Sequence, residues 1–464
     1  MRFRSLCPAP EIGANSYLLD SGTSRVVLDA GMHPKEEGLD ALPRFKELEE
    51  GSIDSVVVTH AHLDHIGSLP VLLRRQPQAK PFFSPAAAEL GFAMLHNSVN
   101  VMQAKREELG ITEYPLFSHR ELDEMEATVE TRPNEKPFDL DFNGLLRGTF
   151  HDAGHVLGST GITIQSGDHR LMYTGDVNFE PSTLIKAANF PEEPVDTLII
   201  ETTRGDSPRD PDYTREAEEY RFAESIRNTL KRGGCVLIPV FAMGKTQEVL
   251  TMIHRFKQEG LVPRKAPVVI GGLSTKMTVI YDKYGNGKTR RSDDSFRILK
   301  DMDLKAGNRR RGRVPIIPQA GTIYCLSSGM MTEKTVSNSF ARHGFLENAK
   351  NSLLFVGYAD PDSPAGKIRK ARPGDPVILD RGHPGVSFRA NMEVFDFSGH
   401  ATREDLLDYI LKVKPATTFL VHGDPAASGW FKERLADVLP TTKAIIPEPG
   451  VDYNLTRLEP VSGA

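Results

Sequence analysis

The sequence predicts an α/β protein in which a second domain interrupts the first, and three observations support this. The chain has 464 residues, more than one small domain needs. Up to about residue 205, short apolar strands repeatedly end in an acid or a histidine, and this style returns near residue 394. Between these parts, helical and apolar β segments alternate (216–232, 235–240, 246–259), which is typical of a parallel sheet.

Composition restricts the class of protein. The formal net charge is -5, so a nucleic-acid partner would have to meet a local basic patch. Three widely spaced cysteines, Cys7, Cys235 and Cys325, argue against a disulfide framework and suggest buried small hydrophobes. The first residues show no secretory signal, and no run approaches a membrane span. We expect a soluble, cytoplasmic protein without a membrane partner.

The first strands form a predicted hairpin, with segments 15–19 and 25–28 joined by a glycine-containing turn. The second strand ends in Asp29, two residues before Gly31. A carboxylate at this point is either an ordinary turn aspartate or one aimed at a neighbouring site.

The most informative stretch follows the apolar segment 54–58, which is predicted to be a buried strand in a parallel part of a sheet. A short helix is expected at 66–75, with Leu69, Leu72 and Leu73 inward. The loop between them carries four candidate ligands of a divalent transition metal, zinc above all: His60, His62, Asp64 and His65. One tetrahedral site does not need four ligands from one loop. The spacing therefore favours two adjacent metals, with His60 and His62 facing one and Asp64 and His65 the other. The alternative is a polar loop with chance histidines.

Further candidates occur downstream at strand ends. His155 lies beside Gly154 and near Gly158, where the backbone can bend sharply. Asp176 follows Gly175, and Glu201 ends the apolar strand 195–203. His400 and His422 adjoin glycines near the end of the chain. His151 is ambiguous, and His96 and His119 are expected to be non-ligands.

The second domain carries a local excess of positive charge. Residues 255–313 contain sixteen Lys or Arg residues and six Asp or Glu residues, and the run Arg309-Arg310-Arg311 is the densest part. Segment 367–372 is a second basic patch. Such a patch is either a phosphate-backbone contact or a solvated face.

In this order, the motif His60-x-His62-x-Asp64-His65 and the residues Asp29, His155, Asp176, Glu201, His400 and His422 resemble the β-CASP branch of the metallo-β-lactamase superfamily. That branch includes the nuclease subunit of the pre-mRNA cleavage and polyadenylation machinery and bacterial ribonuclease J. The resemblance implies an αββα metallo-β-lactamase sandwich formed by 1–205 and 396–464. It also implies an inserted β-CASP domain at 206–395 with a mainly parallel sheet, and RNA entering the cleft between the two domains.

The resemblance also implies roles for individual residues. One zinc would be held by His60, His62, His155 and Asp176, and a second by Asp64, His65, Asp176 and His422, with manganese as an alternative metal. The implied catalytic groups are His400 as general acid, Glu201 as its partner, Asp29 as an orienter, and Asp64. A histidine at position 422 resembles the RNA-cleaving members rather than the DNA-repair members. The implied substrate contacts are Ser328, Gly329, Ser398, Gly399, Arg309, Arg310 and Arg311.

The implied function is a zinc-dependent ribonuclease for RNA processing or decay, in which hydroxide held by two zincs leaves 5′-phosphate and 3′-hydroxyl ends. The resemblance does not decide whether cleavage is internal or proceeds from the 5′ end. It also does not decide whether the protein forms a homodimer. Two alternatives are a small-molecule thioester or lactam hydrolase on the same metal core and a non-catalytic scaffold.

The sequence departs from the family pattern in the segment 244–248, where Lys245 stands in place of the arginine that the family often has.

Overall fold

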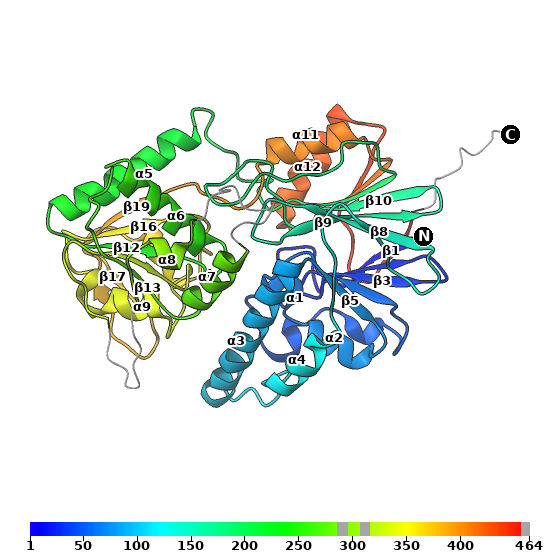
Figure 1. Cartoon of the computed structure of the whole chain (residues 1–464), viewed down its shortest axis with the longest axis horizontal. Coiled ribbons are helices and arrows are strands. Elements are labelled where there is room, and N and C mark those ends of the chain that lie inside the picture. The colour runs from blue at the N-terminus through cyan, green and yellow to red at the C-terminus, as the bar shows by residue number, and fades with distance from the viewer. Residues whose placement is uncertain (285–295, 307–315, 456–464) are drawn as a thin grey trace. The chain divides into compact units, whose positions relative to one another are not determined.

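The computed structural model describes residues 1–284, 296–306 and 316–455 (Figure 1). Arg309, Arg310 and Arg311 therefore lie outside the described residues. The chain forms two compact units: the first contains Met1–Pro181, Ala187–Arg209 and His400–Ala464, and the second contains Ser182–Lys186 and Asp210–Gly399. The sequence pattern divides the chain at 205/206 and 395/396, whereas the units divide at 209/210 and 399/400.

The first unit contains two seven-stranded sheets. In spatial order, the first sheet contains β22 (Asp452–Asn454), β1 (Arg2–Ser5), β2 (Tyr17–Asp20), β3 (Arg25–Leu28), β4 (Ser55–Val57), β5 (Lys80–Phe83) and β6 (Glu130–Thr131). The strands from β22 to β3 are antiparallel, as the predicted hairpin requires, and those from β3 to β6 are parallel. The buried strand β4 lies in the parallel part, which confirms its prediction.

The second sheet combines the chain's middle part with its last segment. Its spatial order is β21 (Lys443–Ile445), β20 (Thr417–Val421), β11 (Thr197–Glu201), β10 (His169–Tyr173), β9 (Thr160–Ser166), β8 (Leu146–Asp152) and β7 (Pro137–Asp139). The strands from β21 to β10 are parallel, and those from β10 to β7 are antiparallel. The chain's C-terminal part therefore extends a sheet that its middle part begins.

The two sheets pack face to face over an apolar core with Phe3 and Val57 from one sheet and Ile199 and Phe419 from the other. Helices cover the outer faces, which gives the αββα sandwich that the family resemblance implies (Figure 1). These helices are α1 (Leu63–Ile66), α2 (Leu69–Arg75), α3 (Pro85–Leu109) and α4 (His119–Glu126) on the first sheet and α11 (Arg403–Val413) and α12 (Pro425–Val438) on the second.

The helix expected at 66–75 begins later than predicted. The chain forms α1, turns at Gly67 and Ser68, and starts α2 at Leu69. Pro70 lies in the first turn of α2, where its missing N–H costs no hydrogen bond, so it favours a new helix start. Leu69 and Leu72 are fully buried, whereas Leu73 is only partly buried.

The second unit is built on a six-stranded sheet in which all neighbours are parallel, as the alternation of helices and strands predicts. Its spatial order is β14 (Leu304–Ala306), β13 (Val268–Ile270), β15 (Ile323–Leu326), β12 (Val236–Pro239), β16 (Ser352–Phe355) and β19 (Asn391–Val394). The small pair β17 (Pro376–Val377) and β18 (Val386–Ser387) is separate. In the described part of this unit, the α-helices are α5 (Arg215–Lys231), α6 (Lys245–Gln258), α7 (Leu273–Lys283), α8 (Ile298–Asp301), α9 (Val336–Phe340) and α10 (Pro364–Lys370).

A buried carboxylate binds the segment Ser182–Lys186, which belongs to the second unit. Glu248 accepts hydrogen bonds from the backbone N–H of Thr183 (2.7 Å) and of Leu184 (2.9 Å), and it also pairs with Arg215. In the same unit, Lys245 donates a hydrogen bond to the carbonyl of Phe397. The motif at 244–248 thus holds two segments that are distant in sequence.

Two findings concern the expectations from composition. All three cysteines are buried and free, which confirms that they do not form disulfides. Of the helices in the described part of the chain, none combines the length and apolar character that crossing a membrane requires.

Candidate metal centre

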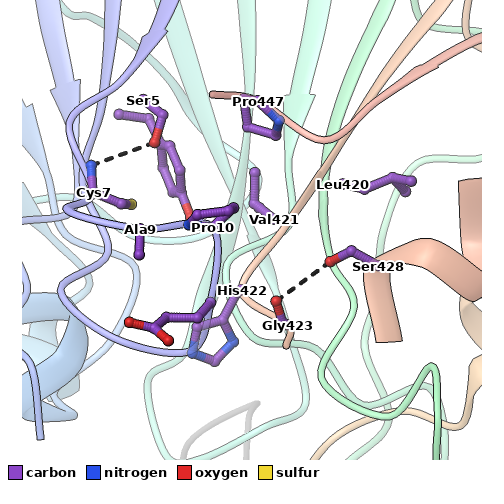
Figure 2. A pocket seen from close by; sticks show the side chains of 12 residues that line it. Ser5, Cys7, Ala9, Pro10, Leu420, Val421, His422, Gly423, Ser428 and Pro447 are labelled. Atoms are coloured by element: carbon purple, nitrogen blue, oxygen red, sulfur yellow. Dashed lines mark hydrogen bonds between the residues drawn. The ribbon is translucent and has the colours of Figure 1, made fainter. Parts of the chain in front are cut away.

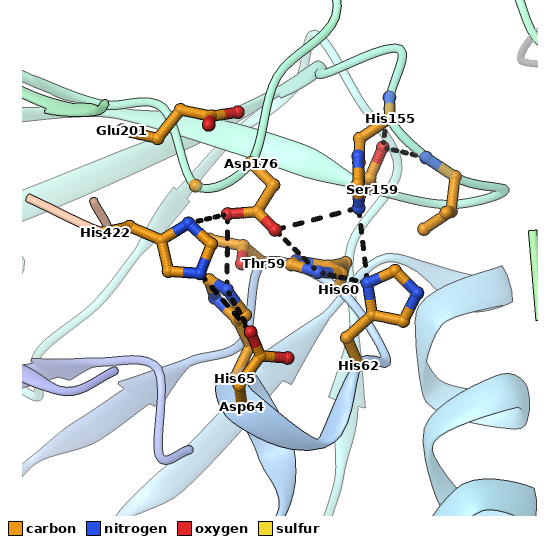
Figure 3. A network of polar contacts seen from close by, with 12 residues as sticks. Thr59, His60, His62, Asp64, His65, His155, Ser159, Asp176, Glu201 and His422 are labelled. Atoms are coloured by element: carbon orange, nitrogen blue, oxygen red, sulfur yellow. Dashed lines mark hydrogen bonds and ion pairs between the residues drawn. The ribbon is translucent and has the colours of Figure 1, made fainter. Parts of the chain in front are cut away.

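The predicted ligands meet at one edge of the two facing sheets of the first unit. The loop with His60, His62, Asp64 and His65 follows β4, whereas Asp176 follows β10. His155 follows β8 and His422 follows β20. Figure 3 shows their side chains pointing toward one another, with Asp176 between His422 on one side and His60 and His155 on the other.

Local sequence explains how the chain places these loops. Gly31 packs against the ligand loop so closely that a Cβ atom there would lie 1.8 Å from the carbonyl oxygen of Asp64. Only glycine fits this approach. Gly175 has a φ of 52°, a left-handed conformation that lets the chain turn between β10 and Asp176.

The first set of converging atoms comes from His60, His62, His155 and Asp176. Nδ1 of His62 lies 3.1 Å from Nε2 of His60 and 3.2 Å from Nε2 of His155. Oδ2 of Asp176 lies 3.5 Å from Nε2 of His60 and 3.7 Å from Nε2 of His155. Three imidazole nitrogens and a carboxylate oxygen around one point form a donor set that suits zinc.

The second set contains Asp64, His65 and His422, with Asp176 again adjacent. Nε2 of His422 lies 3.3 Å from Oδ2 of Asp64, and Nε2 of His65 lies 3.2 Å from Oδ1 of Asp176. Asp176 thus turns one oxygen toward each set, as a shared carboxylate would.

The surroundings of the Asp176 carboxylate are evidence for a cation between the two sets. Its side chain is 2% exposed, and Oδ1 lies 3.0 Å from Nδ1 of His422 and 3.2 Å from Nε2 of His65 without a hydrogen bond of good geometry to either ring. A buried carboxylate oxygen without a hydrogen bond is costly unless a cation compensates it. The residues present therefore fit a divalent metal.

Burial and charge set the protonation of the histidines. Burial lowers the pKa of His60 and of His62, which favours neutral imidazoles with a free lone pair. Burial acts most strongly against protonation of His422, but the charge of Asp176 and hydrogen bonds to Asp176 and Asp64 together outweigh it and raise the pKa of His422 to about 10. A cluster that attracts protons this strongly also attracts a divalent cation, which would displace them.

A separate pair lies beside the two sets. Nδ1 of His400 is 3.0 Å from both oxygens of the Glu201 carboxylate, and Nε2 of His400 is 4.0 Å from Oδ2 of Asp176. The backbone N–H of Val177 donates a 2.7 Å hydrogen bond to Glu201 and fixes this carboxylate. Burial acts most strongly against the charged form of His400, but the carboxylates of Glu201 and Asp176 together outweigh it and raise the pKa of His400. The pair can hold a proton at the edge of the centre.

Several functional contacts have no sequence signal that we recognised. The carboxylate of Asp29, which is fully buried, contacts Thr59, His65 and Tyr173. Thr203 lies 3.1 Å from Nδ1 of His422. Thr59 and Tyr173 are next to predicted ligand segments, but only the pairing of distant strands reveals their common partner.

Other predicted residues lie elsewhere. His96 and His119 form a pair with 2.8 Å between their Nδ1 atoms, and His151 contacts Thr163. Ser328 and Gly329 follow β15 in the second unit, and Ser398 and Gly399 are the last residues of that unit. None of these residues belongs to either set among the described residues.

A small pocket borders the loop of His422 (Figure 2). Its lining includes Ser5, Cys7, Pro10 and Val421 besides His422. Hydrogen bonds within the lining join Cys7 N–H to Ser5 (3.3 Å) and the Ser428 hydroxyl to the carbonyl of Gly423 (3.4 Å). This pocket therefore borders the loop that presents His422.

Comparison with protein families assigns three consecutive parts of the chain. Residues 9–220 match the metallo-beta-lactamase superfamily, residues 246–368 match the Beta-Casp domain, and residues 385–447 match the Zn-dependent metallo-hydrolase RNA specificity domain.

Curated relatives extend over most of the chain. Transcription termination factor FttA of Pyrococcus horikoshii is 30% identical over 437 residues, which cover 89% of this chain and 65% of that protein. FttA of Methanocaldococcus jannaschii is 29% identical over 91% of this chain and 67% of its own length. Endoribonuclease YSH1 of Eremothecium gossypii is 26% identical over 98% of this chain and 58% of its own length. The chain thus spans about 65% of the length of the archaeal relatives.

A solved structure has a similar fold. A protein of unknown function from Enterococcus faecalis V583 superimposes with a TM-score of 0.57 at 12% identity, covering 97% of this chain and 99% of that chain. At this identity the likeness concerns the fold alone.

Proposed function

Because this chain belongs to the metallo-β-lactamase superfamily and carries its β-CASP domain, we propose that it is a metal-dependent ribonuclease that hydrolyses RNA phosphodiester bonds. The observation that carries this proposal is the position of the Glu201–His400 pair beside Asp176. A converging donor set alone would suit many hydrolytic substrates, whereas phosphodiester cleavage also needs an acid for the departing oxygen. YSH1, which is similar over nearly the whole chain, is an endoribonuclease, which supports RNA as the substrate.

The two sets described above would hold two divalent ions. His60, His62, His155 and Asp176 would hold the first, and Asp64, His65, Asp176 and His422 the second, with zinc favoured by the imidazole-rich donors and manganese as the alternative. When bound, such ions supply positive charge that neutralises the phosphate and acidifies a water molecule at the site.

The protein's own residues supply the proton transfer. His400 would donate its Nε2 proton to the departing 3′ oxygen of the RNA, so the products carry 5′-phosphate and 3′-hydroxyl ends. Glu201 would accept a hydrogen bond from Nδ1, which fixes the ring orientation and favours the charged form. Asp29 would orient the ring of His65, whose Nδ1 it contacts. Asp64 would be a ligand of the second ion and, through that ion, one of the catalytic residues.

Ser328, Gly329, Ser398 and Gly399 would contact the RNA. Gly329 packs against Phe241, and a Cβ atom there would lie 3.2 Å from its ring, so the backbone at this point has little room for a side chain. The hydroxyl of Ser328 lies 3.1 Å from that of Thr332 and accepts the backbone N–H of Thr332 at 3.2 Å, so its own proton would be the group that it offers to a phosphate oxygen.

The experiment is an end-mapping assay with the metal-loaded protein. RNA with a 5′-monophosphate, RNA with a 5′-triphosphate and circular RNA are incubated beside a thioester and a lactam. We expect cleavage of RNA with 5′-phosphate products, and cleavage of the circle would identify internal hydrolysis. Turnover of the thioester or lactam without cleavage of any RNA would overturn the proposal in favour of a small-molecule hydrolase.

A further inference from the structure

Asp29 occupies an unusual position at the end of β3. Its side chain is fully buried, and its backbone has a φ of 59°, the left-handed region that residues other than glycine rarely adopt. The conformation turns the carboxylate toward the ligand loop. A buried anion in a strained position implies a specific task.

Four donors surround this carboxylate. Oδ1 accepts the backbone N–H of Thr59 at 2.8 Å, and the Thr59 hydroxyl lies 3.1 Å from Oδ1 and 2.9 Å from Oδ2. Oδ2 also lies 2.8 Å from Nδ1 of His65 and 2.6 Å from the hydroxyl of Tyr173. A carboxylate offers about four lone-pair sites, so these donors fill it.

This arrangement determines the tautomer of His65. Asp29 can only accept, so Nδ1 of His65 must carry the hydrogen of their 2.8 Å bond. In the metal-binding form, Nε2 is then left with its lone pair, facing Asp176 at 3.2 Å.

The same carboxylate acts on His60 through Thr59. The single hydroxyl proton of Thr59 is donated to Asp29, so the oxygen of Thr59 accepts from Nδ1 of His60 at 3.1 Å. Nε2 of His60 is thereby left bare and faces the other members of the first set.

We propose that Thr59 and Tyr173 are positioning residues for the metals, and that Asp29 joins them into one hub that fixes the tautomers of His60 and His65. The inference rests on the ligand sets of the proposed function. Because His60 belongs to one set and His65 to the other, a single buried hub prepares both metal positions. Tyr173 keeps the carboxylate from rotating away, since its hydroxyl is the shortest contact of Oδ2.

The test compares two pairs of variants in a chelator competition for zinc. Tyr173→Phe should bind zinc roughly 10–100-fold more weakly than the wild type, the usual effect of losing such a partner. Tyr409→Phe is the matched control, because it removes another buried tyrosine hydroxyl, which donates 3.0 Å to the carbonyl of Pro191. Urea unfolding of the metal-free proteins measures any general loss of stability in both variants.

A second pair addresses the hydroxyl of Thr59. Thr59→Ser keeps the hydroxyl and should keep wild-type zinc affinity, whereas Thr59→Val removes it and should weaken binding by a similar factor. Thr442→Val, which removes a buried hydroxyl bonded to Pro415, should leave zinc affinity unchanged. If Tyr173→Phe does not fold, the comparison of Thr59→Val with Thr59→Ser still tests whether the hub affects zinc affinity.

Wild-type zinc affinity in both Tyr173→Phe and Thr59→Val would overturn the inference, as would equal weakening in the Tyr409→Phe control. The readout is binding, so it is separate from RNA cleavage. A protein that shows these binding effects but cleaves no RNA would refute the proposed ribonuclease and leave the hub intact.

Discussion

Nδ1 of His400 lies 3.0 Å from each of the two carboxylate oxygens of Glu201, while its Nε2 faces Asp176. If His400 is the acid of the reaction, His400→Ala should lower the rate of RNA cleavage by about 10²–10⁴-fold, the usual contribution of such a group. Metal content should stay at the wild-type level. Single-turnover cleavage and elemental analysis measure the two quantities, and His119→Ala serves as the control. Full activity in His400→Ala would remove it from the mechanism.

The pH profile tests the partner of His400. The charge of Glu201 raises the pKa of His400, so Glu201→Gln should lower that pKa toward its ordinary value. An acid must be protonated to act, and the alkaline decline of the cleavage rate should therefore move to lower pH in this variant. Cleavage rates between pH 6 and roughly pH 10 at constant ionic strength give the comparison. An unchanged alkaline limb would show that another group supplies the proton.

Metal stoichiometry tests the shared carboxylate. Asp176 turns one oxygen to each set, so Asp176→Asn should lose both metals rather than one. Elemental analysis after gel filtration measures metal per chain. Asp139→Asn, which alters an exposed carboxylate 3.6 Å from Arg147, should keep the wild-type content. Retention of half the metal in Asp176→Asn would show that one set binds without Asp176.

Removal of metal should destabilise the first unit. A metal that binds the folded but not the unfolded protein raises the free energy of unfolding by about 2.7 kcal/mol when its free concentration is 100 times Kd. In a domain of this size, each kcal/mol raises Tm by about 2–4 °C. Adding zinc to chelated wild-type protein should therefore raise Tm by several degrees, whereas Asp176→Asn should show no rise. Scanning calorimetry makes the measurement. An equal rise in both proteins would place the stabilising metal elsewhere.

Lys245 should leave a signature in the pH dependence of stability. Burial, with a contribution from Arg215, lowers the pKa of Lys245 from 10.5 to about 8 in the folded protein, although Glu248 acts in the opposite direction. Between these values the unfolded chain binds one proton more, so wild-type stability should rise with pH relative to Lys245→Met. Urea unfolding of both proteins between pH 7 and about pH 10 tests this sign. Lys412→Met, at an exposed ion pair with Glu192, should keep the wild-type slope.

The architecture was predictable because the strands and the long helices carry strong local patterns. The helical segments expected at 216–232 and 246–259 are α5 and α6 to within one residue, and the β segment expected at 235–240 contains β12. The loop after β4 could be interpreted because histidines and an aspartate at such close spacing have few packing explanations. His155, Asp176 and His422 each adjoin glycines at strand ends, and the structure brings all of them together.

The remaining features depend on contacts between distant segments. Nothing local distinguishes Tyr173 from any other buried tyrosine, because its hydroxyl meets Asp29 only once β10 and β3 lie in facing sheets. Likewise, Ser182–Lys186 reads as ordinary loop, although it belongs to the second unit and is bound by Glu248, more than sixty residues away. The break before α2 was missed because leucine periodicity continues across it while Pro70 starts a new helix.

The order of segments along the chain has a consequence for synthesis. His400 and His422 both belong to the last stretch of the first unit, after the whole of the second unit. A ribosome therefore finishes the inserted unit before the residues that complete the donor cluster have been polymerised. A nascent chain that stops before His400 therefore lacks two of the side chains that meet at the centre.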